Sequence, residues 1–126
     1  MKKVILSLCL FTLLITGCQK ECDQWHEGTN CKTEVRAKFL GSFTGNNSIL
    51  GQITIPVTTY GTVNQIWLDG IYGTLTSASG SFTVPLQSVY QGGQSLSIYG
   101  SGIVTRNSLT LTTYVNGNYN YFYGIK

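Results

Sequence analysis

Charged side chains are scarce in this sequence, because Asp, Glu, Lys and Arg make up only 10% of its 126 residues. An ordinary soluble domain carries roughly a quarter. Lys2 and Lys3 lie in the first few residues, so the chain from Cys18 onward keeps six basic and five acidic side chains, a net charge of +1. That balance supplies no basic face and argues against nucleic acid as a partner. Low charge combined with 15 Gly and two Pro also argues against a disordered chain.

The groups needed for catalysis are also nearly absent. Beyond residue 38 the only side-chain carboxylate is Asp69, and the one histidine of the chain, His26, precedes that point. A glycosidase needs two carboxylates and a serine hydrolase triad needs a histidine. No phosphate-binding or nucleotide-binding motif is present. We therefore expect a protein that is not an enzyme and that carries no cofactor.

No apolar run is long enough to span a bilayer as a helix, but a shorter one stands at the N-terminus. Lys2 and Lys3 precede an apolar segment over residues 4–15, a pattern typical of a secretory signal peptide. Residues 14–18, Leu-Ile-Thr-Gly-Cys, resemble a bacterial lipobox. The resemblance implies that residues 1–17 are removed and that Cys18 carries acyl chains that anchor the protein in a membrane. The alternative is an ordinary leader followed by a chance cysteine.

The residues after Cys18 are similar to the export signal of surface lipoproteins in Bacteroidota, which is Gln-Lys followed by acidic residues. Here Gln19, Lys20 and Glu21 match that signal, and Cys22 interrupts the acidic run. The resemblance implies an outer-membrane protein that faces the exterior. A short polar tether of this kind also suits any other lipoprotein.

Two of the four cysteines, Cys22 and Cys31, remain once Cys9 is removed and Cys18 is lipidated. An even pair in an exported chain predicts a disulfide. Together with His26 the two thiols could instead provide three ligands to a metal ion, but structural zinc sites use four ligands and shorter cysteine spacings. We therefore expect the disulfide and no metal.

The segment over residues 22–31 also resembles the last hairpin of an EGF-like module, because eight residues separate its cysteines and Gly28 lies three before the second. Trp25 and His26 depart from that pattern, and the other four cysteines of the module are missing. The calcium and receptor functions of complete EGF modules are therefore not expected.

The distribution of charge divides the mature chain in two. Eight of its eleven charged residues lie in a tether over residues 18–38, and the segment 39–126 is almost neutral. Many small Bacteroidota lipoproteins similarly join an EGF-like tail to a Thr/Gly-rich β-domain. In 39–126, β-branched and aromatic residues recur between Gly, Asn and Ser, which predicts an all-β fold. We expect an antiparallel meander that closes as a sandwich or a small lipocalin-like barrel, with Pro56 and Pro85 at edges or strand ends. The expected strands are 37–44, 49–57, 63–68, 71–76, 81–86, 95–105, 109–115 and 118–125.

Two hairpin turns, Asp69-Gly70 and Asn116-Gly117, have the sequences that two-residue type I′ turns require. A two-residue turn fixes the strand register. Trp67 then pairs with Tyr72, Tyr114 with Tyr119, Thr112 with Tyr121 and Thr110 with Tyr123, while Leu111 pairs with Phe122 on the other face. If the second turn held three residues instead, the tyrosines would join the leucine face. The candidate ligand face consists of Trp67, Tyr72, Tyr114, Tyr119, Tyr121 and Tyr123.

Three functions fit these features. The first is a surface-exposed lipoprotein with a non-catalytic binding or structural β-domain. The second is a module that binds neutral glycans, because aromatic rings stack on sugar C–H groups while amides bind hydroxyls. The third is a lipocalin-like carrier or inhibitor with tyrosines lining a cavity. Aromatic cross-strand pairs also stabilise a sheet without any ligand. Exposure of Tyr119, Tyr121 and Tyr123 as a row favours glycan or protein contact, and a position inside a cavity favours a carrier.

Overall fold

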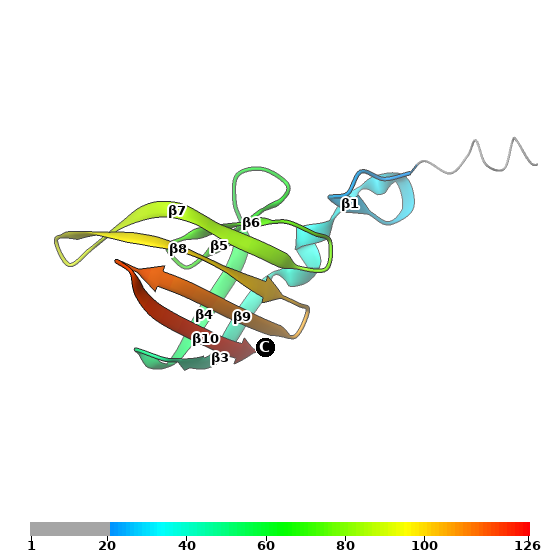
Figure 1. Ribbon diagram of the computed structural model, residues 1–126. Helices are drawn as coiled ribbons and strands as arrows, with labels where there is room; N and C mark the ends of the chain where they lie inside the picture. The colour runs from blue at the N-terminus through cyan, green and yellow to red at the C-terminus, as the bar shows by residue number, and fades with distance from the viewer. Residues whose placement is uncertain (1–20) are drawn as a thin grey trace, which may run out of the picture.

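The strands of the computed structural model, which describes residues 21–126, follow one another as an antiparallel up-and-down meander. Each of β3 to β9 pairs with the next strand along the chain, and β10 pairs back with β3, so eight strands form a closed barrel (Figure 1). The all-β prediction is confirmed, and of its two forms the barrel is the observed one. The expected signal peptide and Cys18 lie outside the described residues. The elements are β1 His26–Glu27, η1 Thr29–Cys31, β2 Thr33–Glu34, η2 Val35–Phe39, β3 Gly41–Asn47, β4 Gly51–Thr59, β5 Gln65–Leu68, β6 Tyr72–Leu75, β7 Ser81–Gln91, β8 Gln94–Val104, β9 Ser108–Val115 and β10 Asn118–Ile125.

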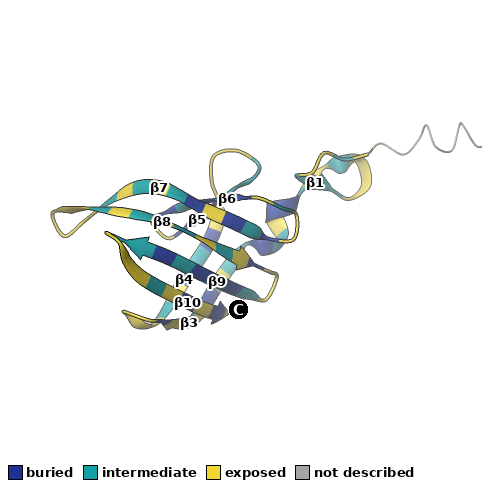
Figure 2. Cartoon of the chain, viewed as in Figure 1, coloured by how far each residue is buried: buried dark blue, intermediate teal, exposed yellow. Residues whose placement is uncertain are grey.

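Apolar and polar residues alternate along the strands, and this alternation places the core inside the barrel. In β9, Leu109, Leu111 and Thr113 are buried, whereas Thr110 and Thr112 are partly exposed. Figure 2 shows the same alternation of dark blue with lighter residues along neighbouring strands. Three phenylalanines provide the bulk of the core, since Phe43, Phe82 and Phe122 are each at most 2% exposed.

Both predicted two-residue turns are confirmed. Asp69 and Asn116 have φ near +50°, and the glycine after each also has positive φ, as a type I′ turn requires. Trp67 is therefore paired with Tyr72, and Tyr114 with Tyr119. The remaining pairs expected on β9 and β10, including that of Leu111 with Phe122, are also observed.

The expected strand over 37–44 is wrong in its first part. Residues Val35–Phe39 form a short 3₁₀ helix, η2, and strand β3 begins only at Gly41. Val35 and Phe39 are buried in the core, so this helix closes one end of the barrel. The helix packs on the core at Val35 and Phe39 and on the β4–β5 loop at Arg36, so tertiary contacts override the strand pattern of the sequence. The core thus begins with Val35, inside the segment that charge alone assigns to the tether.

Neither proline lies at an edge or a strand end, because a closed barrel has no edge strands. Pro56 lies within β4, one residue beyond the point where the pairing of β4 with β5 stops at Val57. Its missing N–H therefore falls where no neighbouring strand needs it. Pro85 lies within β7 at a shift in register between Val84 and Gln87, and β7 continues to Gln91, five residues past its expected end. A β-bulge of this kind accommodates a residue without an N–H.

The side chain of Arg36 connects η2 to the loop between β4 and β5 through hydrogen bonds. The side chain is 8% exposed. Its Nη1 donates hydrogen bonds to the main-chain oxygens of Tyr60, Thr62 and Gln65 at 2.7, 2.7 and 2.8 Å. Its Nε donates to Glu34 Oε2 at 2.6 Å. One guanidinium therefore bonds three carbonyl groups, of which those of Thr62 and Gln65 also accept the main-chain amides of Gln65 and Tyr60.

Candidate functional site

A cavity of about 440 Å³ opens at the end of the barrel away from η2. Its walls come from the hairpin ends of the strands: the β3–β4 and β5–β6 connections contribute, and so do strand residues of the β7–β8 and β9–β10 hairpins. In Figure 1 the long β7–β8 hairpin extends at this end, on the left of the view, and the two-stranded β1–β2 hairpin lies beyond the opposite end. The largest aliphatic side chains of the lining are Leu50, Ile53, Ile55, Leu68, Ile71, Leu96, Ile98 and Leu111.

The cavity exists because the bulky side chains gather at the other end. Phe82 packs over Gly73 and Gly102, where a Cβ atom would lie only 2.8 and 2.5 Å from its ring. Those glycines make room for the ring inside the closed half. The lining residues of the open half are mainly aliphatic, and the space between them stays open. In Figure 2 the outer half of the β7–β8 hairpin is drawn in teal and yellow, and none of its residues is buried.

The barrel strands are shortest at the β5–β6 hairpin. Both strands have four residues, against eleven in β7 and in β8, and β6 pairs with β7 at only two positions. Beyond these two pairs, toward the open end of the barrel, hydrogen bonds from the Gln87 side chain replace the pairing of β6 with β7. Its Oε1 accepts a bond from the Tyr72 amide at 3.0 Å, and its Nε2 donates to the oxygens of Tyr72 and Pro85 at 2.9 and 3.0 Å. The Asp69-Gly70 turn therefore forms a notch in the rim of the cavity.

The cavity is almost uncharged. Among its lining residues within 21–126, Asp69 is the only one that carries charge at neutral pH, and it is exposed at the rim. Three polar side chains, Asn47, Thr113 and Asn120, lie on the wall formed by β3, β9 and β10. The arrangement suits an apolar molecule with few polar groups, which is the usual character of a small-molecule pocket.

The tyrosines expected on a ligand face do not line this cavity. Tyr119, Tyr121 and Tyr123 form a row on the outside of β10 and are 56%, 37% and 49% exposed. Tyr114 lies beside the row, with its ring 5.9 Å from that of Tyr119 in an edge contact. Tyr99, which the turn-based reasoning missed, stacks on Tyr114 at 5.1 Å. The sequence feature that could have predicted this contact is the short connection between β8 and β9, because it pairs Tyr99 with Tyr114.

Trp67 and Tyr72 belong to a different outer surface. Tyr60, also missed, stacks on both of them with ring centroids 5.1 Å apart in each case. Strands β5 and β6 are separated from β8 on one side by β7, and β4 is separated from β10 by β3. The predicted ligand face is therefore two aromatic clusters on different parts of the barrel wall.

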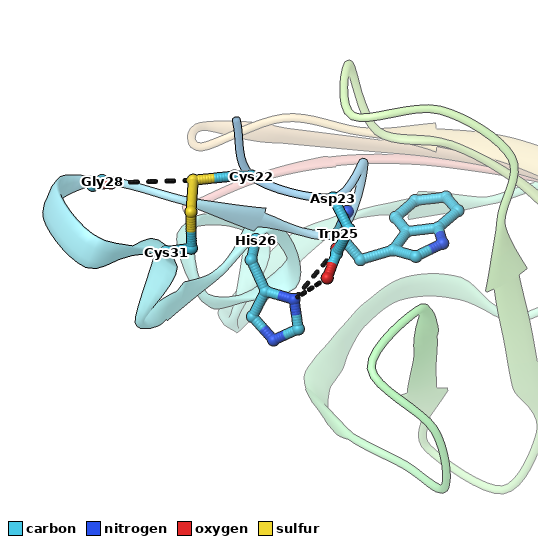
Figure 3. Close-up of a disulfide and its surroundings, with 6 residues drawn as sticks. All are labelled: Cys22, Asp23, Trp25, His26, Gly28 and Cys31. Atoms are coloured by element: carbon cyan, nitrogen blue, oxygen red, sulfur yellow. Dashed lines mark hydrogen bonds and ion pairs between the residues drawn. A yellow bond between two sulfur atoms is a disulfide. The ribbon is translucent and has the colours of Figure 1, made fainter. Parts of the chain in front are cut away.

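The disulfide between Cys22 and Cys31 is confirmed, with an S–S distance of 2.05 Å (Figure 3). His26 does not approach the sulfurs as a metal ligand. Its Nδ1 donates instead to the Asp23 carboxylate, 2.8 Å from Oδ2. The pKa of Asp23 is lowered from its ordinary value of 3.8, first by the main-chain amide of Trp25 that donates to the carboxylate and then by His26.

The hairpin that the disulfide closes also contacts the barrel. Trp25 is partly buried against the core, and its main-chain oxygen accepts a 2.9 Å hydrogen bond from the amide of Val35. Figure 3 shows its indole ring pointing away from the disulfide. Trp25 therefore connects the hairpin to the barrel and is no part of the cavity.

Within residues 21–126, no group of three His, Cys, Asp or Glu side chains is placed to hold a metal ion. No helix in the same range has the length and apolar character needed to cross a bilayer. Compared with known proteins, the chain matches no family model, no curated protein and no solved structure.

Proposed function

We propose that this chain is a lipid-anchored outer-membrane protein, without catalytic activity, whose barrel binds a small apolar ligand in its open cavity. The cavity carries the proposal. Its volume of about 440 Å³ falls within the range of small-molecule sites, roughly 300–1,000 Å³. Its lining is mainly aliphatic, and the mouths of β-barrels are a frequent place for such sites. Of the three functions inferred from the sequence, the carrier is therefore favoured, with aliphatic side chains in place of the tyrosines.

The lipid anchor is proposed at Cys18, four residues before Cys22. The hairpin closed by Cys22 lies beyond the end of the barrel that η2 closes, as Figure 1 shows. Acyl chains on Cys18 would thus attach the protein by its closed end and leave the cavity open to the solvent. On the outer face of the outer membrane, this orientation would let the barrel capture apolar molecules from outside the cell.

The anchor is tested by substitution in the native host. We expect Cys18→Ser to abolish incorporation of a radiolabelled fatty acid into the protein, because it removes the thiol that receives the lipid. Cys9→Ser is the matched control and should still be labelled, since Cys9 lies in the segment that is removed. Protease treatment of intact cells should degrade the wild-type barrel. Fatty-acid labelling of Cys18→Ser, or protection of the barrel, would contradict the anchor or its outward orientation.

A second candidate function rests on the exposed row of Tyr119, Tyr121 and Tyr123 beside threonines of β9. Aromatic faces on a neutral, hydroxyl-rich surface are suited to neutral glycans. The stack of Tyr99 on Tyr114 adds aromatic surface next to the row. This site lies on the outer wall, so it is independent of the cavity and can be tested separately.

One pair of variants separates the two functions. Ile98 faces the cavity and Tyr121 faces outward. The apolar probe is an uncharged decyl diazirine, which reacts on irradiation with the residues around it. The full chain in lipid nanodiscs is irradiated with this probe, and the label attached to β8 is measured by peptide mapping. We expect Ile98→Trp to lower this labelling at least tenfold, because indole fills the cavity, and Tyr121→Ala to leave it unchanged. A difference of about 1.4 kcal/mol in binding free energy corresponds to tenfold.

The same two proteins are applied to an array of neutral polysaccharides. If the tyrosine row binds glycans, Tyr121→Ala lowers the signal and Ile98→Trp does not. Equal labelling of wild type and Ile98→Trp would overturn the cavity proposal, and equal array signals for wild type and Tyr121→Ala would overturn the glycan alternative.

A further inference from the structure

Three polar side chains of the cavity, those of Asn47, Thr113 and Asn120, lie together on one part of its wall. Thr113 on β9 is paired directly with Asn120 on β10, and Asn47 on β3 is paired with Phe122, two residues further along β10. Asn47 and Thr113 are buried, at 7% and 4% exposure. A polar cluster in a mainly aliphatic cavity gives a ligand one preferred orientation.

The hydrogen bonds of Asn47 leave its amide nitrogen as a donor for a ligand. Its Oδ1 accepts the main-chain amides of Ile49 and Leu50 at 2.9 and 3.0 Å, and these bonds fix the orientation of the side chain. Its Nδ2 bonds to no residue within 21–126. No polar side-chain atom that is sealed from solvent lacks a partner in that part of the chain, so this nitrogen reaches open space. Because Asn47 lines the cavity, we infer that the open space next to Nδ2 is the cavity.

Thr113 supplies a second donor. Its Oγ1 accepts a bond from Asn120 Nδ2 at 3.4 Å, and Asn120 Oδ1 accepts one from the Ser48 hydroxyl at 3.1 Å. Because Oγ1 is the acceptor in the first bond, the proton of the Thr113 hydroxyl remains free to be donated. Asn47 and Thr113 therefore offer donors from the same wall, and they match an uncharged acceptor such as an ester or amide carbonyl.

The charges at the cavity disfavour an anion. Among its lining residues in 21–126 there is no Lys, Arg or His. The one carboxylate, Asp69, lies in the β5–β6 turn, which is across the barrel from β10 in the order of the strands. A carboxylate ligand would be removed from water without a cation to compensate it, which is strongly unfavourable. It would also be repelled by Asp69.

We propose that the cavity selects uncharged single-chain amphiphiles, with the carbonyl of a neutral lipid ester bound by Asn47 and Thr113 and the chain lying among the aliphatic residues, and that it rejects fatty acid anions of the same length. The inference rests on the proposed function, since it names the class of ligand for the same cavity. Aliphatic side chains of β4, β7 and β8 surround the alkyl chain, and the polar head remains next to β3, β9 and β10.

The test is a competition in the labelling experiment on the full chain. Monodecanoylglycerol and decanoate have the same acyl chain, but the head group of the first is an uncharged glycerol ester and that of the second is a carboxylate. At pH 8 we expect monodecanoylglycerol to halve the labelling of β8 at a concentration at least tenfold lower than decanoate. Thr113→Val keeps the shape of the side chain but removes the donor, so about five- to tenfold more monodecanoylglycerol should be needed. The concentration of decanoate that halves the labelling should be the same in Thr113→Val and wild type. Each competitor partitions into the nanodisc lipid equally in the two samples, so partition does not affect this comparison.

Asp69→Asn is the complementary variant, because asparagine is equally favoured in the type I′ turn and the fold is preserved. Since the carboxylate is exposed and screened by salt, its removal should improve competition by decanoate by about threefold. Equal competition by the two compounds in the wild type, or no change in Thr113→Val, would overturn the inference while leaving the cavity proposal intact. Absence of β8 labelling in the wild type would overturn both.

Discussion

Replacing Arg36 with alanine is expected to lower the free energy of unfolding by about 2–4 kcal/mol, because a buried side chain that forms charge-assisted hydrogen bonds is lost. The guanidinium bonds three main-chain oxygens of the β4–β5 loop, those of Tyr60, Thr62 and Gln65, and the Glu34 carboxylate. Without it the Tyr60 carbonyl loses the donor that Arg36 provides, and the carbonyls of Thr62 and Gln65 keep only their main-chain bonds. Urea denaturation followed by tryptophan fluorescence measures the loss, because Trp67 pairs in the adjoining strand β5.

The matched control is Arg106→Ala, since Arg106 is exposed in the turn between β8 and β9. Its substitution should change the free energy of unfolding by less than about 0.5 kcal/mol, as is usual for surface sites. Arg36→Lys is a second comparison, because a single ammonium group cannot reproduce the planar donor geometry and should recover only part of the loss. A change below 1 kcal/mol in Arg36→Ala would contradict the role of this residue in closing the barrel.

Substituting Gly45 with alanine is expected to destabilise the protein by about 3 kcal/mol, the upper end of the usual cost of overpacking. A Cβ atom on Gly45 would lie 1.9 Å from the main-chain oxygen of Tyr123 and 2.4 Å from the Cα of Gly124. Both obstacles are backbone atoms, so no side chain can turn away to relieve the clash. They belong to β10 where it pairs with β3, and only four residue pairs close the barrel there.

The effect should be local to this seam at first. Hydrogen exchange is expected to become faster in β3 and β10 before it does in β7 and β8, because local opening follows the loss of pairing. Gly92→Ala is the control: Gly92 has φ +60°, but no atom lies within 4 Å of the added Cβ. It should cost about 1 kcal/mol through backbone conformation alone. Similar losses in the two variants would show that the close contact at Gly45 is not what matters.

The hairpin registers could be read from the sequence because their causes are local. Asp69-Gly70 and Asn116-Gly117 adopt positive φ, a two-residue turn sets which residues face each other, and alternation then places Tyr119 and Phe122 on opposite faces of the sheet. The disulfide between Cys22 and Cys31 was equally local, since only two cysteines follow Cys18. The start of β3 was misplaced because the 3₁₀ turn at Val35–Phe39 depends on a core that the sequence does not display.

The cavity depends on distant contacts, so the sequence did not reveal it. Residues such as Leu50, Ile98 and Leu111 look like ordinary core positions until the closure of eight strands brings them around one empty space. Whether that space is filled depends on where the bulky side chains lie, and Phe82 is placed in the closed half by Gly73 and Gly102. The aromatic residues that attracted attention in the sequence lie outside, because they alternate with the core residues.

By itself, the sequence determined the all-β class, the two tight turns, the disulfide and the face of the sheet that the tyrosines share, since each follows from the period of a strand or the geometry of a short loop. Only the tertiary structure decided that the sheet closes as a barrel, that η2 and Arg36 seal one end, and that the other end is hollow. The physical reason is that closure and cavity volume depend on the packing of side chains from all eight strands at once.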